Sequence, residues 1–93
     1  MKDYVIAGDY KQFRWFCNQR KEAPNKYIYL TQSAQIRGVS FPIVYYVGTW
    51  YELPIDTLDE INRLILQSKG KIAYVMEDGG IKWAVETGGK AAL

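Results

Sequence analysis

The chain has 93 residues, enough for one small domain with its own core. Apolar residues make up 48% of the sequence and aromatic residues 15%, a composition that excludes a disordered chain. Twelve Lys and Arg residues against ten Asp and Glu residues give a net charge of +2, and the two signs are interspersed, so the charge does not indicate a dedicated nucleic-acid binder.

Histidine is absent, and Cys17 is the single cysteine. The chain therefore lacks the commonest general base and the usual metal ligand, and no disulfide can form within it. We expect no enzyme activity, no metal and no cofactor, with Cys17 as a small buried hydrophobe. A lone thiol is typical of a reducing cytoplasm. The lack of a signal-peptide core and of an apolar run of about 20 residues predicts that no membrane is involved.

The first predicted unit is a strand over residues 4–7, which ends at Gly8, and a helix over residues 10–21. Asp9 precedes the helix and Gln12 follows three residues later, the spacing of a capping box. Apolar residues recur every three or four positions along the helix, which predicts one buried face.

The second predicted strand covers residues 26–31, after Pro24 has ended the first helix. Ser33 is expected to cap a single helical turn that closes at Gly38. The next strand, residues 43–47, reads Ile-Val-Tyr-Tyr-Val. Five consecutive β-branched or aromatic residues without a charge are typical of a strand buried on both faces of a parallel sheet.

A second helix is predicted after Pro54, because Thr57 and Glu60 have the spacing of a capping box. Apolar residues follow at helical spacing until Gly70.

Two further strands, residues 71–77 and 81–87, flank the turn Asp78-Gly79-Gly80 and predict a C-terminal hairpin. Residues 1–88 are then a single domain, and residues 89–93 are expected to be a flexible tail.

The alternation of strands and helices predicts right-handed crossovers and an α/β fold of three layers. Helices would cover both faces of a mostly parallel five-stranded sheet. We expect the strand order 2-1-3-4-5, with the last strand antiparallel at an edge.

Ligands of such sheets bind beyond the carboxyl ends of the strands, near the point where the strand order reverses. The residues predicted at this rim follow the first three strands and are Gly8, Asp9, Tyr10, Thr31, Gly48, Thr49, Trp50, Tyr51 and Glu52. The first helix points its N-terminus at the rim and could favour an anion, but the loop has one glycine and a negative charge. Capping and turn formation alone account for Asp9 and Gly8.

Trp50 and Tyr51 are the stronger binding candidates, because aromatic residues just past a strand end are favoured anchors of interfaces. The alternative is that both fold back over the core, since a small domain needs its aromatic residues for burial. A separate set of basic and aromatic residues could bind nucleic acid or a partner protein: Lys11, Arg14, Trp15, Lys21 and Arg37.

Short motifs carry two resemblances to known families. Ser33, Ile36-Arg37-Gly38 and the apolar strand after them resemble the Walker B half of phage terminase and helicase-like ATPases. Gly48-Thr49 stand where that family has an Asp–Glu pair, and its phosphate-binding loop is missing, so the resemblance implies no ATPase activity. More broadly, Ala-Gly-Asp-Tyr-x-x-Phe at residues 7–13, Ile-Arg-Gly at 36–38 and Val-Gly-Thr-Trp-Tyr-Glu at 47–52 resemble small uncharacterised Rossmann-like α/β proteins of phages and mobile elements.

We expect a non-catalytic accessory protein that binds another macromolecule, or a second copy of itself, through aromatic surface. Residues 81–87 lie at an open edge of the predicted sheet and offer one route to self-association. The alternatives are a nucleotide or small ligand at the rim, and nucleic acid on the basic face of the first helix.

Overall fold

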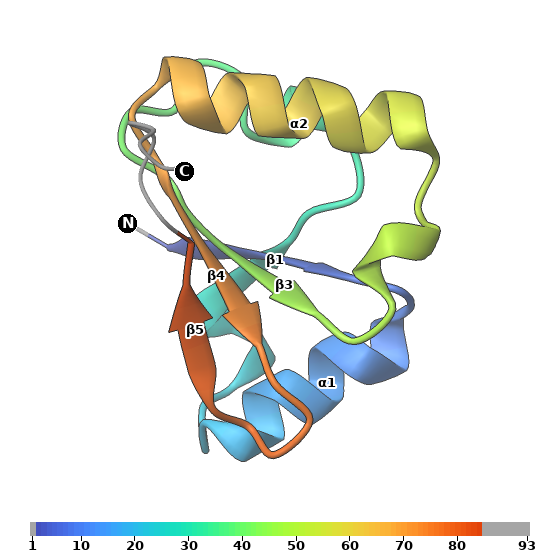
Figure 1. Cartoon of the computed structure of the whole chain (residues 1–93). Helices are drawn as coiled ribbons and strands as arrows, with labels where there is room; N and C mark the ends of the chain where they lie inside the picture. Colours follow the sequence, from blue (N-terminus) through green and yellow to red (C-terminus); the bar gives the residue numbers. More distant parts are fainter. Residues whose placement is uncertain (1, 85–93) are drawn as a thin grey trace.

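The computed structural model of the chain describes residues 2–84. Five strands form one sheet in the order β2-β1-β3-β4-β5 (Figure 1). The strands are β1 (Asp3–Ala7), β2 (Tyr27–Tyr29), β3 (Ile43–Val47), β4 (Lys71–Val75) and β5 (Ile81–Trp83). All pairings are parallel except that of β4 with β5, which is antiparallel. The predicted α/β class and strand order are confirmed.

Helices α1 (Tyr10–Gln19) and α2 (Ile55–Gln67) cover opposite faces of the sheet, which gives the three predicted layers (Figure 1). Side chains alternate along each strand, so neighbouring residues enter different cores. Tyr45 packs with Phe13 and Phe16 on the α1 side, whereas Tyr46 packs with Ile61 on the α2 side. Cys17, on the α1 side, has no exposed surface and is the buried hydrophobe that the sequence predicts.

Helix α1 ends earlier than predicted, at Gln19 rather than at residue 21. Lys21 has a left-handed φ of 57°, and its amide donates to the Asn18 carbonyl at 3.0 Å. The Glu22 amide donates to the Cys17 carbonyl, also at 3.0 Å. These two bonds form a Schellman motif, which satisfies the last carbonyls and turns the chain away from the helix axis.

Helix α2 begins before the predicted cap, and the capping box expected from Thr57 and Glu60 is wrong. Pro54 precedes the helix, and its carbonyl accepts the first helical bond, from the Leu58 amide at 3.1 Å. The Glu60 carboxylate instead pairs with the Arg37 guanidinium at 2.7 Å, so it does not turn back to the helix start.

Helix α2 ends at Gln67, before the predicted Gly70. Lys69 takes the left-handed position with a φ of 60°, and the Gly70 amide donates to the Ile65 carbonyl at 2.8 Å. Gly70 is needed for another reason. A Cβ at this position would lie 2.5 Å from the carbonyl oxygen of Pro42, which the strand ladder holds in place.

The single helical turn Ser33–Gln35 is capped by Gln32 and not, as predicted, by Ser33. The Gln35 Oε1 atom accepts the amide hydrogens of Thr31 at 2.7 Å and of Gln32 at 2.9 Å. The Gln35 Nε2 atom donates to the Tyr29 carbonyl at 3.1 Å. These bonds draw the chain out of the sheet, which is why β2 is shorter than the predicted strand over 26–31.

The C-terminal hairpin is present, but β4 ends at Val75 rather than at residue 77, because the connecting loop takes residues 76–80. The predicted last strand is observed over Ile81–Trp83 and does not include Ala84, and its residues 85–87 lie outside the described residues. The predicted tail, 89–93, lies outside them as well.

Candidate functional site

The strand order reverses between β1 and β3. Ala7 and Val47 are register partners at the carboxyl ends of these strands, so Gly8 and Gly48 open the two loops together. From there the chain leaves toward α1 on one face and toward α2 on the other (Figure 1). In open α/β sheets this is the crevice in which ligands bind.

The side chain of Gln12 fills this crevice. Its Oε1 atom accepts the amide hydrogens of Gly8 and Thr49, both at 2.9 Å, and its Nε2 atom donates to Thr49 Oγ1 at 2.9 Å. Half of the predicted capping box is present, because Asp9 accepts the Gln12 amide hydrogen at 3.0 Å. The Gln12 side chain bonds across the crevice rather than back to Asp9. We refer to Gly8, Gln12 and Thr49 as the glutamine clamp.

Both loop glycines leave the space that the Gln12 and Thr49 side chains occupy. A Cβ on Gly8 would lie 1.9 Å from Thr49 Oγ1, and one on Gly48 would lie 2.2 Å from Gln12 Oε1. Gly48 also has a φ of 58°, a conformation that disfavours other residues. The amide hydrogens of Gly8, Gln12 and Thr49 are therefore already bonded within the chain, and the Gln12 side chain occupies the space between the two loops.

A cavity of about 370 Å³ lies beside the clamp on the α1 side of the sheet. We call it the rim cavity, and its lining residues are Gln12, Trp15, Val47, Gly48, Thr49, Tyr51, Val75, Met76 and Glu77. Tyr51 is 61% exposed and Met76 41% exposed, while Trp15 is half-buried against the α1-side core. Glu77 is the one charged residue in this lining, so the rim cavity is mainly aromatic and apolar.

Trp50 and Tyr51 have different environments although they are adjacent. Trp50 packs on the α2-side core, with its ring centroid 4.8 Å from that of Tyr46 and 5.9 Å from that of Tyr74. The interpretation that the aromatics fold back over the core therefore holds for Trp50. Tyr51 lies on the α1 side and is exposed, as a contact residue requires.

The remaining predicted rim residues mainly contact neighbouring side chains or solvent. Tyr10 packs against Phe13 and Tyr29, with ring centroids 5.4 Å and 5.5 Å away. Thr31 bonds to the Gln35 side chain, and Glu52 is exposed in the turn Trp50–Glu52. The nine predicted residues thus share the rim, but the structure brings only some of them to one cavity.

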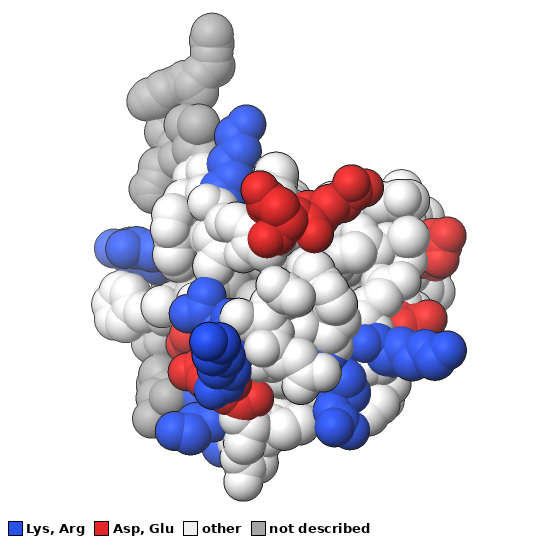
Figure 2. Space-filling view, turned by 90° about the horizontal axis from the view of Figure 1, so that it is seen from below, with Lys and Arg blue, Asp and Glu red and all other residues white. Residues whose placement is uncertain are grey.

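The basic set does not form a single surface. Arg37 follows a turn that contacts α2 and pairs with Glu60, whereas Lys11 and Arg14 lie on α1, on the opposite face of the sheet. Trp15 is turned inward to the rim cavity, and Lys21 lies beyond the end of α1. Figure 2, which views the molecule from below, shows the basic side chains in separate groups with acidic side chains close to some of them.

A second group of titratable residues lies at the other end of α1. The Arg20 Nε atom donates to Tyr27 Oη at 2.9 Å, and the Tyr27 hydroxyl donates to Glu22. Burial, followed by the bond to Glu22, raises the pKa of Tyr27, and the same bond lowers the pKa of Glu22. Arg20 also lies over the rings of Phe16 and Tyr45, 5.6 Å and 5.4 Å from their centroids. These contacts join the end of α1 to the sheet, and we assign the group a structural role.

The chemistry available to the described residues is limited. Cys17 is fully buried, and burial raises the pKa of its thiol, which disfavours the reactive thiolate. Within residues 2–84, His, Cys, Asp and Glu side chains form no cluster of three that could hold a metal ion. Neither helix of this part of the chain combines the length and the apolar character needed to cross a membrane.

Sequence reasoning missed five residues of the rim cavity, which are Gln12, Val47, Val75, Met76 and Glu77. The spacing indicates a local capping role for Gln12, and the predicted strand over 71–77 includes Met76, which lies just past the end of β4. The predicted strand order could have placed Met76 at the rim, because a β4 that is parallel to β3 ends at the same edge of the sheet. No local pattern could have found the bonds from Gln12 to Thr49.

Comparisons with protein-family models, curated proteins and solved structures found no match for this chain.

Proposed function

We propose that this domain is a non-catalytic accessory module of a phage or mobile element, and that it binds another protein at the rim cavity. The observation that carries the proposal is the exposure of Tyr51 and Met76 in a cavity whose lining also includes the apolar residues Trp15, Val47 and Val75. Tyr, Trp and Met are enriched in protein interfaces, and Tyr and Trp are frequent among the residues that dominate binding energy.

The glutamine clamp supports this function because it fixes the loop that carries Tyr51. Three hydrogen bonds join Gln12 to Gly8 and Thr49, two residues before Tyr51. A wall that is already ordered loses little conformational entropy on binding, so an apolar side chain of the partner can enter without reorganising the loop. Glu77 provides one polar contact at the edge of the same cavity.

The chemistry of the chain supports binding rather than catalysis. Histidine is absent, and the single thiol is buried with a raised pKa. A nucleotide at the crevice is less favoured, because the Gln12 side chain occupies the crevice and already accepts the amide hydrogens of Gly8 and Thr49. A cytoplasmic location belongs to the same proposal, since a lone reduced thiol is typical of that compartment.

The test replaces Tyr51 by the photoreactive residue p-benzoylphenylalanine and irradiates the full chain in cells that naturally contain it. Leu66 is the control position, because it is 60% exposed in α2 and is not part of the rim cavity lining. We expect a cross-link to one defined protein from position 51 and none from position 66.

A band at twice the chain mass from position 51 would identify a second copy as the partner and would support the self-association form of the proposal. Absence of cross-links from position 51, or the same products from both positions, would overturn it.

A further inference from the structure

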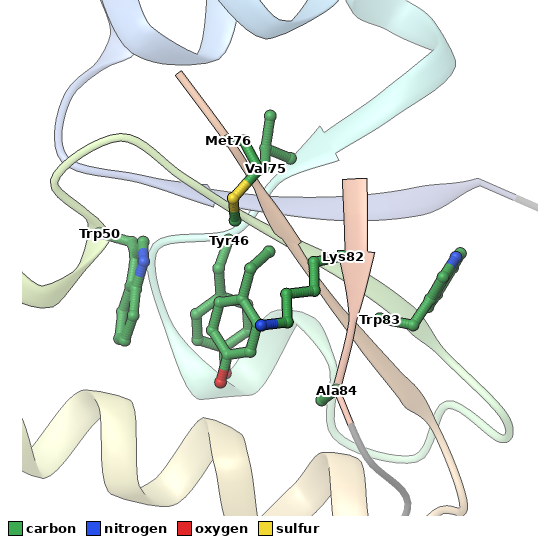
Figure 3. A pocket seen from close by; sticks show the side chains of 8 residues that line it. Tyr46, Trp50, Val75, Met76, Lys82, Trp83 and Ala84 are labelled. Atoms are coloured by element: carbon green, nitrogen blue, oxygen red, sulfur yellow. The ribbon is translucent and has the colours of Figure 1, made fainter. Parts of the chain in front are cut away.

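The other face of the sheet has a hollow that is separate from the rim cavity. Helix α2 packs over the centre of the sheet, where Leu58, Ile61 and Ile65 are buried against β1 and β3. On the same face, beside α2, a cavity of about 480 Å³ lies over the ends of β3, β4 and β5 (Figure 3). We call it the hairpin hollow, and its lining residues are Tyr46, Trp50, Tyr74, Val75, Met76, Lys82, Trp83 and Ala84.

Three aromatic rings make the wall of this hollow. The ring centroids of Tyr46 and Trp50 are 4.8 Å apart, those of Tyr46 and Tyr74 are 5.4 Å apart, and those of Trp50 and Tyr74 are 5.9 Å apart. The Tyr46 hydroxyl donates to Asn62 of α2, so this ring is fixed. Figure 3 shows Trp50 standing on one side of the hollow, while the Trp83 side chain points away from the other residues.

Among the described residues of the lining, Lys82 alone supplies an ammonium group. It is the register partner of Tyr74, so its side chain leaves β5 on the same face as the Tyr74 ring. Figure 3 shows this side chain extended toward Tyr46. None of the acidic residues within 2–84 lies at salt-bridge distance from Lys82. Among residues 2–84 the lining includes no Asp or Glu, so the charge that these residues bring to the hollow favours an anion.

We propose that the hairpin hollow binds a small planar molecule that carries a negative charge. The planar part stacks against Trp50 or Tyr74, because aromatic side chains favour stacked and edge-on contacts with other rings. The negative group meets the Lys82 ammonium. The volume is within the range of about 300–1,000 Å³ that small-molecule sites occupy. An aromatic carboxylate and a nucleoside monophosphate share this chemistry.

Calorimetric titrations of the full chain at low salt test the proposal with two charged probes and their neutral partners. The probes are 2-naphthoate with 2-naphthamide, and AMP with adenosine. We expect at least one charged probe to bind about tenfold more tightly than its neutral partner, the size of one charge-assisted contact. Preference for 2-naphthoate would indicate an aromatic acid, and preference for AMP would indicate a nucleotide.

Two lysine variants separate a specific site from general attraction. Lys82→Gln should bring the affinity for the charged probe down to that for its neutral partner. Lys71→Gln is the matched control, because Lys71 is also an exposed strand lysine but lies at the other end of β4. Lys71→Gln should bind the charged probe with the same affinity as the unmodified chain. Equal affinities for charged and neutral probes, equal losses in the two variants, or no binding of any probe at millimolar concentration would overturn the proposal.

The outcome of these titrations is independent of the proposal for the rim cavity. Position 51 is not in the lining of the hairpin hollow, and Lys82 is not in the lining of the rim cavity. A failed titration therefore leaves the cross-linking result intact, and the reverse also holds.

Discussion

Replacement of Gln12 by alanine tests the glutamine clamp directly. The change removes two bonds to backbone amides and one to the Thr49 hydroxyl, all at 2.9 Å. At about 1 kcal/mol net for each bond, the upper figure is about 3 kcal/mol. The site is only partly buried, so water can reach some of the freed groups, and we expect a loss of about 2 kcal/mol in the free energy of unfolding.

Urea denaturation followed by circular dichroism measures this loss. In a domain of this size, 1 kcal/mol shifts the melting temperature by about 4–8 °C, so Gln12→Ala should lower it by roughly 10 °C. Gln67→Ala is the matched control, because Gln67 is an exposed glutamine at the end of α2. Equal stability of the two variants would refute the clamp as a stabilising contact.

A double-mutant cycle with Thr49→Ala then isolates the bond from Gln12 Nε2 to the Thr49 hydroxyl. We expect a coupling energy of about 1 kcal/mol, since the two side chains bond directly. Additive losses would mean that Gln12 acts only through the backbone amides.

Three further predictions follow from named contacts. Gly48→Ala should destabilise the fold by about 1–3 kcal/mol more than Gly38→Ala, because both glycines have positive φ but only Gly48 would place a Cβ against Gln12. That difference in urea stability should vanish in the Gln12→Ala background. Burial raises the pKa of Tyr46, so the folded state holds this proton above the unfolded pKa of about 10, and stability should fall as pH rises beyond that value. Urea titrations between pH 8 and 11 should show a shallower fall for Tyr46→Phe than for the unmodified chain. Cys17, which is fully buried, should react with a disulfide reagent only at the rate of unfolding, and a fast reaction in the folded protein would contradict the core assignment.

The fold could be predicted from the sequence because its strands are short apolar runs separated by clear breaks. Residues 43–47 are uncharged, and Val44 to Val47 are all buried at the centre of the sheet. Such a run has few alternatives to a central parallel strand. Once this strand is placed, the alternation of strands and helices leaves few possible orders.

The two capping boxes are predicted less well than the strands, for different reasons. A capping box assumes that the third residue of the helix bonds back to the cap. In α1 that residue is Gln12, and its side chain bonds to Thr49, 37 residues away, a partner that is near only when the sheet has formed. In α2 the helix begins at Ile55, so Thr57 is already inside it and cannot be the cap.

The clamp also changes where a ligand can bind. In an open α/β sheet the reversal of strand order supplies both space and free amide hydrogens. Here the Gln12 side chain occupies that space and accepts two of those amide hydrogens, from Gly8 and Thr49. In the turn Trp50–Glu52 that follows, Trp50 lies on one face of the sheet and Tyr51 on the other.

Two adjacent residues therefore line two cavities with different chemistry. The rim cavity has one carboxylate, from Glu77, and the hairpin hollow has one ammonium, from Lys82. Because Val75 and Met76 line both cavities, the end of β4 is the element that separates them.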